Sequence, residues 1–468
     1  MSAVSCHPDA SLRASAGAQG PSRRDVLGAA AALVVLPSAR SARTYQANEK
    51  IDVALIGCGG RGEWFVDTIP KLERIVALCD VNDERAARSY AKLPDVPRHT
   101  DFRRMLDQIG KRIDAVIIAA PDHIHAPAAM MAMAMGKPVF CEKPLTHDIR
   151  EARAIRAAAA RTRVVTQMGN QGTASEAFRR CCELVWAGAI GEVRQVYAWN
   201  EAGGSGMRPV PHGEQPVPRS LQWDLFLGPV QFRPYHPDWM NWHAWRDFAT
   251  GQLGNWASHT MNLPFRALRL DTLWDSGARR TFRVRAEVGV STPSTFPQWE
   301  ILTYELPARG AMPPVTITWI NGGTAPRGRK DVEDLLGRKL DWGDAGEKKW
   351  ADYAGCLLVG SKGMIHSTGH NMSYTLLPEE RFRGYESPPQ TLPRVAGPEV
   401  EWFQAIRGQG ATMSNFEVAS RLAEFTHIGN VATLHPPEVV YHPSQGRVLS
   451  PSAANAALGR AYRPGWTL

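Results

Sequence analysis

Four apolar runs of strand length lie between residues 51 and 144, and the segments between them have helical patterns. The runs are "IDVALI" at 51–56, "RIVALC" at 74–79, "DAVIIAAP" at 114–121 and "PVFCEKP" at 138–144. Strands that alternate with helices in this way form βαβ units and a parallel sheet. The pattern therefore predicts an α/β protein with a doubly wound parallel sheet in its N-terminal part.

The first apolar run ends in Gly57-x-Gly59-x-x-Gly62, and a helical pattern follows. In this context Gly57 permits a tight turn, Gly59 lets the backbone approach a pyrophosphate, and Gly62 allows close packing of helix on strand. A lone glycine triplet can also be an ordinary glycine-rich turn. Between a strand and a helix, it favours a dinucleotide-binding Rossmann domain.

Asp80 ends the second apolar run, 23 residues after Gly57. A carboxylate at this distance can accept hydrogen bonds from ribose hydroxyls and would repel a 2′-phosphate, which favours NAD over NADP. The alternative is a helix cap at "DVNDERAAR". Histidines 123 and 125 follow the third run, where they could line a nicotinamide pocket or serve only in a turn or helix start.

Beyond about residue 168 the chain has shorter strand-like runs, many prolines and 14 of its 15 tryptophans. Seven tryptophans fall between Trp186 and Trp256. Such amphipathic rings can form apolar platforms for the faces of a sugar. Trp239, Trp242 and Trp245 are the best candidates for this role, and most of the others are expected in the core or in a subunit interface.

The N-terminus has the pattern of an export signal. Paired Arg23 and Arg24 precede the apolar run "AAAALVVL", and small residues follow it up to residue 43. The run is too short to remain as a membrane-spanning helix, and the arginine pair is typical of the twin-arginine route. We expect cleavage near residues 39–43 and a periplasmic location.

Composition narrows the possible partners and metals. The 468 residues suggest more than one domain, and the formal net charge of +8 falls to about +5 without the predicted signal, with no long basic run, so nucleic-acid binding is not indicated. The seven cysteines include no CxxC pair, and HExxH is absent. We therefore interpret the cysteines as small buried residues and expect no metal site.

An ordered set of motifs resembles the Gfo/Idh/MocA oxidoreductases, a family that includes glucose-fructose oxidoreductase and inositol dehydrogenase. The set comprises the glycine motif, "CDVND", "PDHIH" and "CEKPLTH", followed by "TQMGNQG", "WAGAIGEV", "WDLFLGP", "GQLGNWASH", "LLVGSKGMI" and "SNFEVASRLAEFTHIGNVA". The resemblance implies a Rossmann domain at 48–168. It also implies, at 169–468, an α/β domain with a large, mostly antiparallel sheet whose outer face forms a homodimer or homotetramer.

The same resemblance implies the site residues. Pro121, Glu142 and Lys143 would border the cofactor, and the Lys143 ammonium would stabilise the alkoxide that forms as hydride departs. Without the surrounding motifs, Lys143 would be interpreted as a surface lysine before a turn proline. His259 matches the base that accepts the substrate hydroxyl proton.

If "LGNWASHTMN" is helical, Asn255, His259 and Asn262 share one face. The family pattern has aspartate where this chain has Asn255, and commonly also at Asn262. Asparagine can still orient a ring nitrogen, but it carries no charge to stabilise an imidazolium, which predicts a weaker base. The alternative for His259 is a core histidine.

Three functions are consistent with these features. The first is an NAD-dependent oxidoreductase that transfers hydride from a sugar, glycoside or polyol to a tightly bound cofactor. The second is a redox-neutral enzyme that cleaves glycosides by transient oxidation, which would regenerate the cofactor in an exported protein. The third is a non-catalytic carbohydrate-binding relative.

Overall fold

The computed structural model of the protein describes residues 49–275, 277, 280–340 and 353–468. The predicted export signal and its cleavage site lie outside these residues. Within the described part of the chain, no helix combines the length and the apolar content that a membrane span needs.

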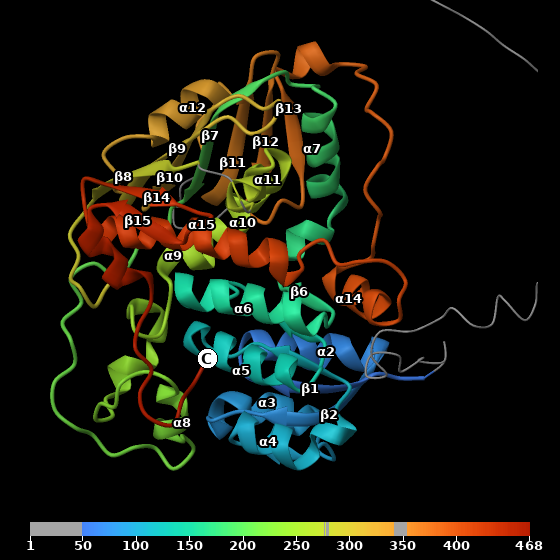
Figure 1. The fold of residues 1–468 in the computed structure, drawn as a ribbon, viewed down its shortest axis with the longest axis vertical. Helices are drawn as coiled ribbons and strands as arrows, with labels where there is room; N and C mark the ends of the chain where they lie inside the picture. The colour runs from blue at the N-terminus through green and yellow to red at the C-terminus, as the bar shows by residue number, and fades with distance from the viewer. Residues whose placement is uncertain (1–48, 276, 278–279, 341–352) are drawn as a thin grey trace, which may run out of the picture. The chain divides into compact units, whose positions relative to one another are not determined.

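Six parallel strands form the first sheet, in the order β3-β2-β1-β4-β5-β6 (Figure 1). This is the order of a doubly wound Rossmann sheet, so the predicted fold class of the N-terminal part is confirmed. The strands are β1 (Asp52–Ile56), β2 (Arg74–Cys79), β3 (Arg98–His99), β4 (Ala115–Ile118), β5 (Val139–Cys141) and β6 (Thr166–Met168).

Helices connect these strands, and polar side chains begin several of them. Asn82, Asp101 and Asp148 each accept a hydrogen bond from a backbone N–H in the first turn of the helix that follows. The helices are α2 (Arg61–Leu72), α3 (Asp83–Lys92), α4 (Phe102–Ile109), α5 (Asp122–Ala134) and α6 (Ile149–Thr162), with a short 3₁₀ turn η1 (Gly110–Arg112).

The second sheet has nine strands in the order β13-β12-β11-β7-β10-β9-β8-β14-β15. Neighbouring strands are antiparallel except β7 and β10, so the predicted mostly antiparallel sheet is confirmed. The strands are β7 (Val193–Asn200), β8 (Phe282–Val288), β9 (Glu300–Leu306), β10 (Val315–Asn321), β11 (Ala354–Gly360), β12 (Met364–Thr368), β13 (Tyr374–Leu377), β14 (Glu438–His442) and β15 (Arg447–Ser450).

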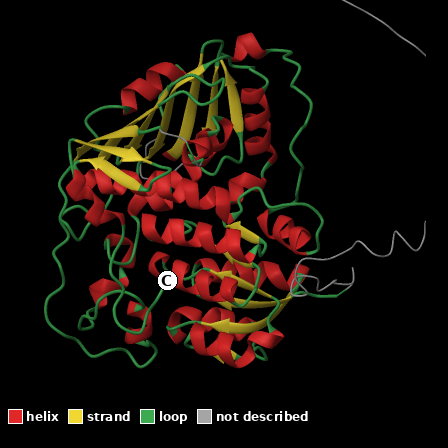
Figure 2. Ribbon diagram, in the orientation of Figure 1, coloured by secondary structure: helices red, strands yellow, loops and turns green. Residues whose placement is uncertain are grey.

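Helices fill the space between the two sheets, as the red and yellow segments of Figure 2 show. The longest of them, α15 (Phe416–Leu434), packs against α6 on one side and β8 on the other, and it is buried along most of its length. The remaining helices are α7 (Glu176–Trp186), α8 (Trp223–Leu227), α9 (Gly251–Asn255), α10 (Ala257–Thr260), α11 (Asn262–Ala267), α12 (Arg329–Leu336) and α14 (Pro398–Ile406). The 3₁₀ turns are η2 (Gln171–Ala174), η3 (Pro237–Met240), η4 (Trp242–Ala244), η5 (Leu270–Trp274), η6 (Glu379–Phe382) and η7 (Ser452–Leu458).

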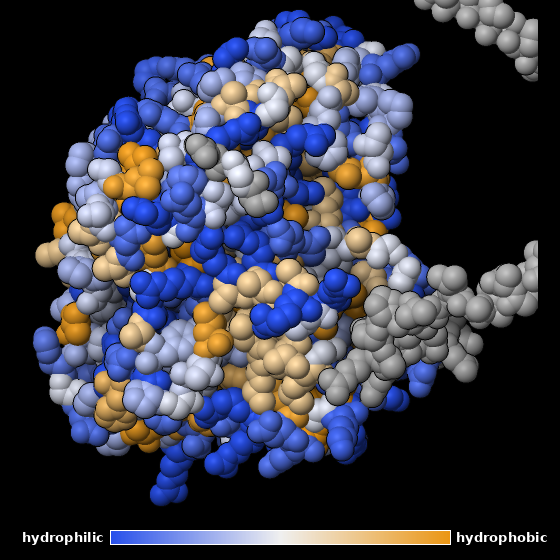
Figure 3. All heavy atoms as spheres, in the orientation of Figure 1, coloured by the Kyte–Doolittle hydropathy of each residue, from blue (hydrophilic) through white to orange (hydrophobic). Residues whose placement is uncertain are grey.

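The surface in Figure 3 is mostly polar, with a pale apolar area over α5 and α6. Both helices are rich in alanine, and α5 also contains Met130, Met131 and Met133. Met133 is buried, and the other two are partly buried against the core. The six described cysteines are free and buried, as predicted.

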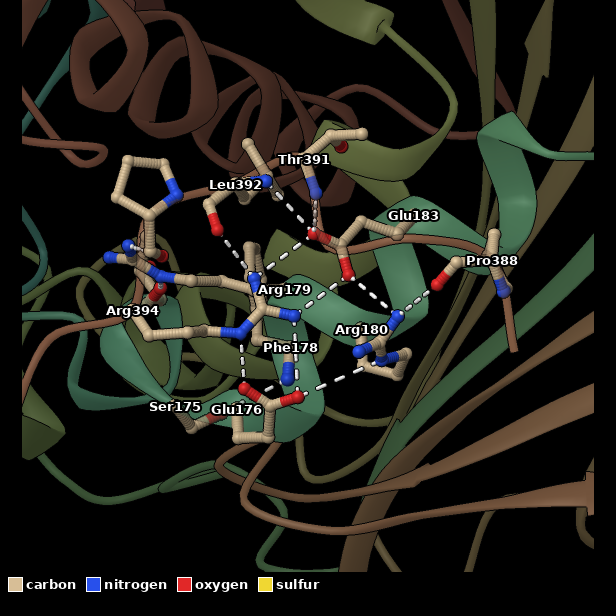
Figure 4. Close-up of polar contacts among 12 residues, drawn as sticks. Ser175, Glu176, Phe178, Arg179, Arg180, Glu183, Pro388, Thr391, Leu392 and Arg394 are labelled. Carbon is tan, nitrogen blue, oxygen red and sulfur yellow. Dashed lines mark hydrogen bonds and ion pairs between the residues drawn. The ribbon is translucent and has the colours of Figure 1, made fainter. Parts of the chain in front are cut away.

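The segment that links β13 to α14 is held against α7 by the buried carboxylate of Glu183 (Figure 4). Glu183 accepts hydrogen bonds from the backbone N–H groups of Thr391 and Leu392, at 2.7 and 2.9 Å. It also accepts two from the Arg394 guanidinium, at 3.0 and 2.7 Å. Burial alone would raise the pKa of Glu183, but these hydrogen bonds lower it to about 2.

We expect Glu183→Gln to destabilise the protein at pH 7, because the variant loses the charge-assisted bonds to Arg394. The folded pKa lies below the unfolded value, so this contribution is present above pH 4.5 and is lost as the pH falls toward 2. A shift of this size corresponds to about 3 kcal/mol in the free energy of unfolding. Urea-unfolding midpoints at pH 7, 4 and 2.5 should show the wild-type advantage shrinking with acidity.

Glu176→Gln is the matched control, because Glu176 also pairs with Arg394 but its side chain is 57% exposed. Exposed ion pairs contribute about 0–1 kcal/mol, so this variant should stay close to wild type at every pH. An advantage of wild type over Glu183→Gln that does not change with pH would contradict the assignment.

Candidate active site

A cavity of about 980 Å³ lies at the carboxyl ends of β1, β2, β4 and β5. This is the edge at which doubly wound sheets bind ligands, and the volume is at the upper end of the usual range of about 300–1,000 Å³. Of the predicted site residues, all but Gly62 line it: Gly57, Gly59, Asp80, Pro121, Glu142, Lys143, Asn255 and His259.

The glycine turn fits closely between its neighbours. Gly57 has a φ of +85°, and a Cβ there would lie 2.7 Å from the carbonyl oxygen of Ala119. A Cβ on Gly62 would lie 2.1 Å from the carbonyl oxygen of Gly57. Gly62 therefore packs against the backbone of the turn and does not line the cavity, as expected for a glycine that lets helix and strand pack closely.

The start of α2 offers room for a phosphate. Gly59, Gly60 and Arg61 line the cavity, and a Cβ on Gly60 would meet no atom within 4 Å. The first backbone N–H groups of a helix have no intrahelical acceptor and favour an anion. The turn therefore fits the pyrophosphate of a dinucleotide.

Asp80 supports the glycine turn as well as lining the cavity. Its Oδ2 accepts hydrogen bonds from the N–H groups of Cys58 (2.7 Å) and Gly59 (3.2 Å), and its Oδ1 accepts one from Asn82 (2.9 Å). Burial raises the pKa of Asp80, and these backbone bonds oppose the shift. Because Asp80 also lines the cavity, its carboxylate can meet a ribose hydroxyl there.

Lys143 points from the end of β5 toward the segment that carries His259. Its Nζ donates to Asn255 Oδ1 at 2.5 Å and to the Asn255 carbonyl oxygen at 3.4 Å. Burial lowers the pKa of Lys143, while the charges of Glu142 and Asp122 act in the opposite direction. Glu142 is itself held by Arg61, with Nε 2.7 Å from Oε1.

The segment around His259 is not one regular helix. Residues 251–267 form three short helices, α9, α10 and α11, which meet at Trp256 and Met261. Asn255 and His259 still line the same cavity, but Asn262 does not; its Nδ2 donates to Thr173 Oγ1 at 2.8 Å. The predicted shared face therefore holds for two of the three polar residues.

The side chain of Asn255 bonds to Lys143 and Gln252 and makes no hydrogen bond with the His259 ring, which corrects the expectation that it orients the imidazole. Its Oδ1 accepts from Lys143, and its Nδ2 donates to Gln252 Oε1 at 3.3 Å. The physical reason is that the buried Lys143 ammonium, a strong hydrogen-bond donor, lies within hydrogen-bond distance of the Asn255 amide oxygen. In this structure Asn255 positions Lys143.

His259 instead faces a second imidazole that the sequence patterns do not indicate. The rings of His259 and His370 lie 4.7 Å apart at 73°, and both residues line the cavity. Asn371, which has a φ of +56°, donates from Nδ2 to the His259 carbonyl oxygen at 2.7 Å. No motif marks this turn between β12 and β13, so only the fold brings His370 to the site.

His259 is neutral at neutral pH. Burial lowers its pKa well below 6.5, and the positive charge of Lys143 acts in the same direction, followed by His370 and Arg61. Burial also lowers the pKa of His370. The cavity therefore presents two uncharged imidazoles close to one ammonium group.

The predicted tryptophan platform is only partly correct. Trp239 and Trp245 are buried and pack together at 4.8 Å in a small core of their own, with Phe226 and Phe248. Trp242 lines the cavity, where it stacks on His243 at 3.5 Å, and Trp256 lines it beside His259. A cluster of aromatic residues in the sequence does not show which rings line the cavity, because the geometry of the loops determines where each ring points.

His123 and His125 occupy structural positions. The ring nitrogens of His123 lie 2.7 and 3.3 Å from the carbonyl oxygens of Phe226 and Phe248, and burial lowers its pKa to about 3. His125 borders the cavity, but both its nitrogens lie 2.7 Å from carbonyl oxygens, those of Pro144 and Ala120. His125 therefore braces the turn that carries Lys143.

The N-terminal part of the chain is similar in sequence to known oxidoreductases. Residues 51–170 match a family described as "Oxidoreductase family, NAD-binding Rossmann fold". Over these residues the chain is similar to the Gfo/Idh/MocA oxidoreductases. An inositol 2-dehydrogenase from Streptomyces avermitilis is 34% identical over 128 residues, which are 27% of this chain and 36% of that protein. Across eight such dehydrogenases, the aligned part spans only 28% to 44% of their length.

Solved structures extend the likeness in fold to both sheets of the protein. The WlbA dehydrogenase from Bordetella pertussis, in complex with NADH and UDP-GlcNAcA, has a TM-score of 0.53 at 15% identity, covering 82% of this chain and 97% of that one. A levoglucosan dehydrogenase in complex with NADH has a TM-score of 0.52 at 16% identity, covering 83% and 98%. At these identities the likeness concerns the fold.

Among the described residues, His147, Asp148 and Glu151 lie close enough together to hold a metal ion. These residues already bond to other groups of the protein. His147 Nε2 lies 2.7 Å from the Arg246 carbonyl oxygen, and Asp148 caps α6. Glu151 accepts from the backbone N–H of His147 at 2.8 Å. The absence of a metal site stays a prediction for this protein.

Proposed function

We propose that this protein is an NAD-dependent oxidoreductase that removes hydride from a CH–OH group of a sugar, glycoside or polyol. The observation that carries the proposal is the meeting of Lys143 and neutral His259 in the cavity that also contains the glycine turn and Asp80. The residues fit a dinucleotide because the glycine turn leaves space for phosphate and Asp80 can bind ribose hydroxyls. The carboxylate would repel a 2′-phosphate, which supports NAD over NADP.

In the proposed reaction, His259 accepts the proton of the substrate hydroxyl while the C–H bond breaks. The Lys143 ammonium stabilises the oxygen as it gains negative charge, and Asn255 holds Lys143 in place. Nicotinamide supplies the acceptor for the hydride when the cofactor is bound. The products are a carbonyl group, a protonated His259 and reduced cofactor, so charge and electrons balance.

The substrate class is supported by the walls of the cavity. Trp242 and Trp256 offer apolar ring surface, while His243, His370 and Arg208 add polar groups that can bind hydroxyls. The similar proteins named above include dehydrogenases of inositol and levoglucosan, both rich in hydroxyl groups. A polyhydroxylated ring is therefore the proposed substrate.

Redox-neutral cleavage of a glycoside is the second candidate function, and the His259–His370 pair favours it. Elimination after transient oxidation needs one group to accept the proton next to the new carbonyl and another to protonate the leaving oxygen. Two neighbouring imidazoles can serve these roles in turn. Water would then add to the unsaturated ketone in place of the leaving group, and hydride would return to the carbonyl carbon, so NADH would not accumulate.

We also propose that the protein binds its cofactor before export and reaches the periplasm by the twin-arginine route. We further propose that it forms a homodimer or homotetramer. Cell fractionation after replacement of Arg23 and Arg24 by lysine tests the location, because a periplasmic variant would contradict it. Light scattering tests the oligomer, and a monomer at working concentration would contradict that part.

The deciding experiment uses protein purified without added nucleotide. Bound nucleotide is released and identified, and nicotinamide absorbance is then followed in the intact protein as sugars, polyols and glycosides are added. Bound NAD that one of them reduces supports the oxidoreductase, whereas cleavage of a glycoside without NADH supports the second candidate. Protein that neither contains nor takes up NAD would contradict both.

Asn255→Asp tests the unusual asparagine. A carboxylate beside the ammonium should raise the pKa of Lys143 and move the alkaline limb of the pH–rate profile to higher pH. Asn262→Asp is the matched control, because Asn262 bonds to Thr173 outside the cavity and should leave that limb in place. An unmoved limb in Asn255→Asp contradicts the role of Lys143, and a gain in kcat above about 100-fold would indicate a degraded site of the non-catalytic kind.

A further inference from the structure

The last ten residues of the chain return from the second sheet to the Rossmann part. After η7, Tyr462 donates from its hydroxyl to Glu151 Oε1 at 2.8 Å. Arg463 donates to the Gly228 carbonyl oxygen at 2.6 Å and to Asp224 Oδ1 at 2.6 Å. Figure 1 shows this dark red segment passing between α5 and α8. The tail is thus fixed to α6 and to the region of α8.

Trp466 is the residue that this tail presents to the cavity. It is half-buried although Gly465 and Thr467 on either side are exposed. The ring lies 6.0 Å from that of Phe102, and the Arg103 guanidinium lies over it at 4.2 Å from the centroid. Arg103 is itself held in place by two hydrogen bonds to Asp101, at 3.0 and 2.8 Å.

The position of Trp466 in the cavity can be related to the parts of a dinucleotide. In the strand order β3-β2-β1-β4-β5, the glycine turn after β1 lies between Asp80, after β2, and Lys143, after β5. On the other side of Asp80 lies β3, and the N–H of Asp80 donates to the His99 carbonyl oxygen at 3.0 Å. Thr100, Asp101, Phe102 and Trp466 therefore line the cavity beyond Asp80, at the far end from the catalytic residues. With pyrophosphate at the turn and ribose at Asp80, that end receives the adenine.

We propose that Trp466 packs against the adenine and that the C-terminal tail slows release of the cofactor. This inference rests on the proposed function. Aromatic rings bind bases through stacking, and Arg103 behind the ring holds it in place. The tail lies outside the Rossmann part, so its contact with the adenine would hold the cofactor in addition to the contacts of the glycine turn.

Trp466→Ala, Trp466→Phe and Phe232→Ala test this proposal. Phe232 is the matched control, because it is 69% exposed and does not line the cavity. We expect Trp466→Ala to weaken binding of NADH and of AMP by about 5- to 100-fold and to speed NADH release. Trp466→Phe should retain most of the affinity, and Phe232→Ala should equal wild type. Binding of nicotinamide mononucleotide should be the same in all four proteins.

Three results would overturn the inference. One is equal affinity of wild type and Trp466→Ala for AMP. Another is an equal loss of affinity for nicotinamide mononucleotide, which would mean that the variant disturbs the whole cavity. The third is a failure of Trp466→Phe to restore affinity. If wild-type protein binds no NADH, the proposed function itself fails, which is a distinguishable outcome.

Discussion

Lys143→Met is expected to lower the rate of substrate-dependent NAD reduction by about 10²–10³ or more, while NAD still binds. Lys143 is the one described cation whose ammonium contacts the His259 segment, through Asn255. Methionine has a similar length and fits a partly buried position, but it carries no charge to stabilise the forming alkoxide. Single-turnover absorbance at the reduced-nicotinamide band measures the effect, and NADH binding is measured on the same sample.

Lys137→Met is a suitable control. Lys137 is also half-buried in the Rossmann part, where its Nζ donates to the Ile113 carbonyl oxygen at 2.6 Å, and it does not line the cavity. Its loss should leave the rate of hydride transfer close to that of wild type. Undiminished reduction in Lys143→Met would remove Lys143 from the mechanism, and loss of NADH binding would assign it to the cofactor alone.

His259→Gln is expected to lower the same rate by about 10²–10⁴, because a glutamine amide cannot accept the hydroxyl proton. The working base is the neutral imidazole, so wild-type activity should fall as the pH drops through the pKa of His259. Burial and Lys143 hold that pKa well below 6.5, so this group leaves the rate unchanged above pH 6.5.

His370→Gln separates the two imidazoles. The charge of protonated His370 contributes to lowering the pKa of His259, so its removal should move the acid limb of the pH–rate profile to higher pH. His259→Gln should abolish that limb. If His259→Gln keeps wild-type activity, His259 is a core histidine; if His370→Gln causes the larger loss, His370 is the base.

The residues of the glycine turn could be predicted because their roles are local. A strand, a glycine triplet and a helix follow one another within 20 residues, and backbone sterics then determine the turn. Asp80 could be predicted for a related reason, since the end of β2 lies next to the end of β1 in every sheet of this order. The carboxyl ends of parallel strands converge, so sequence spacing was sufficient.

The partner of Asn255 could not be predicted in this way. Its position in a helical pattern suggested His259, four residues on, but the closest strong group is Lys143, 112 residues away in the chain. The interruption at Trp256 also depends on packing, because the ring contacts Tyr353 at 5.6 Å and His370 at 5.0 Å. Long-range contacts outweighed helical periodicity here.

The sequence alone was therefore enough to specify the Rossmann sheet, the dinucleotide turn and the two residues expected to perform proton and charge transfer. The sheet and the turn follow from apolar periodicity and short spacings along the chain, whereas the two residues follow from the motifs that resemble the Gfo/Idh/MocA oxidoreductases. Tertiary structure was needed to select Trp242 and Trp256 among the tryptophans, to place His370 opposite His259 and to bring Trp466 to the far end of the cavity. Those side chains come from turns and a tail with no periodic pattern, and only the packing of distant segments determines where they point.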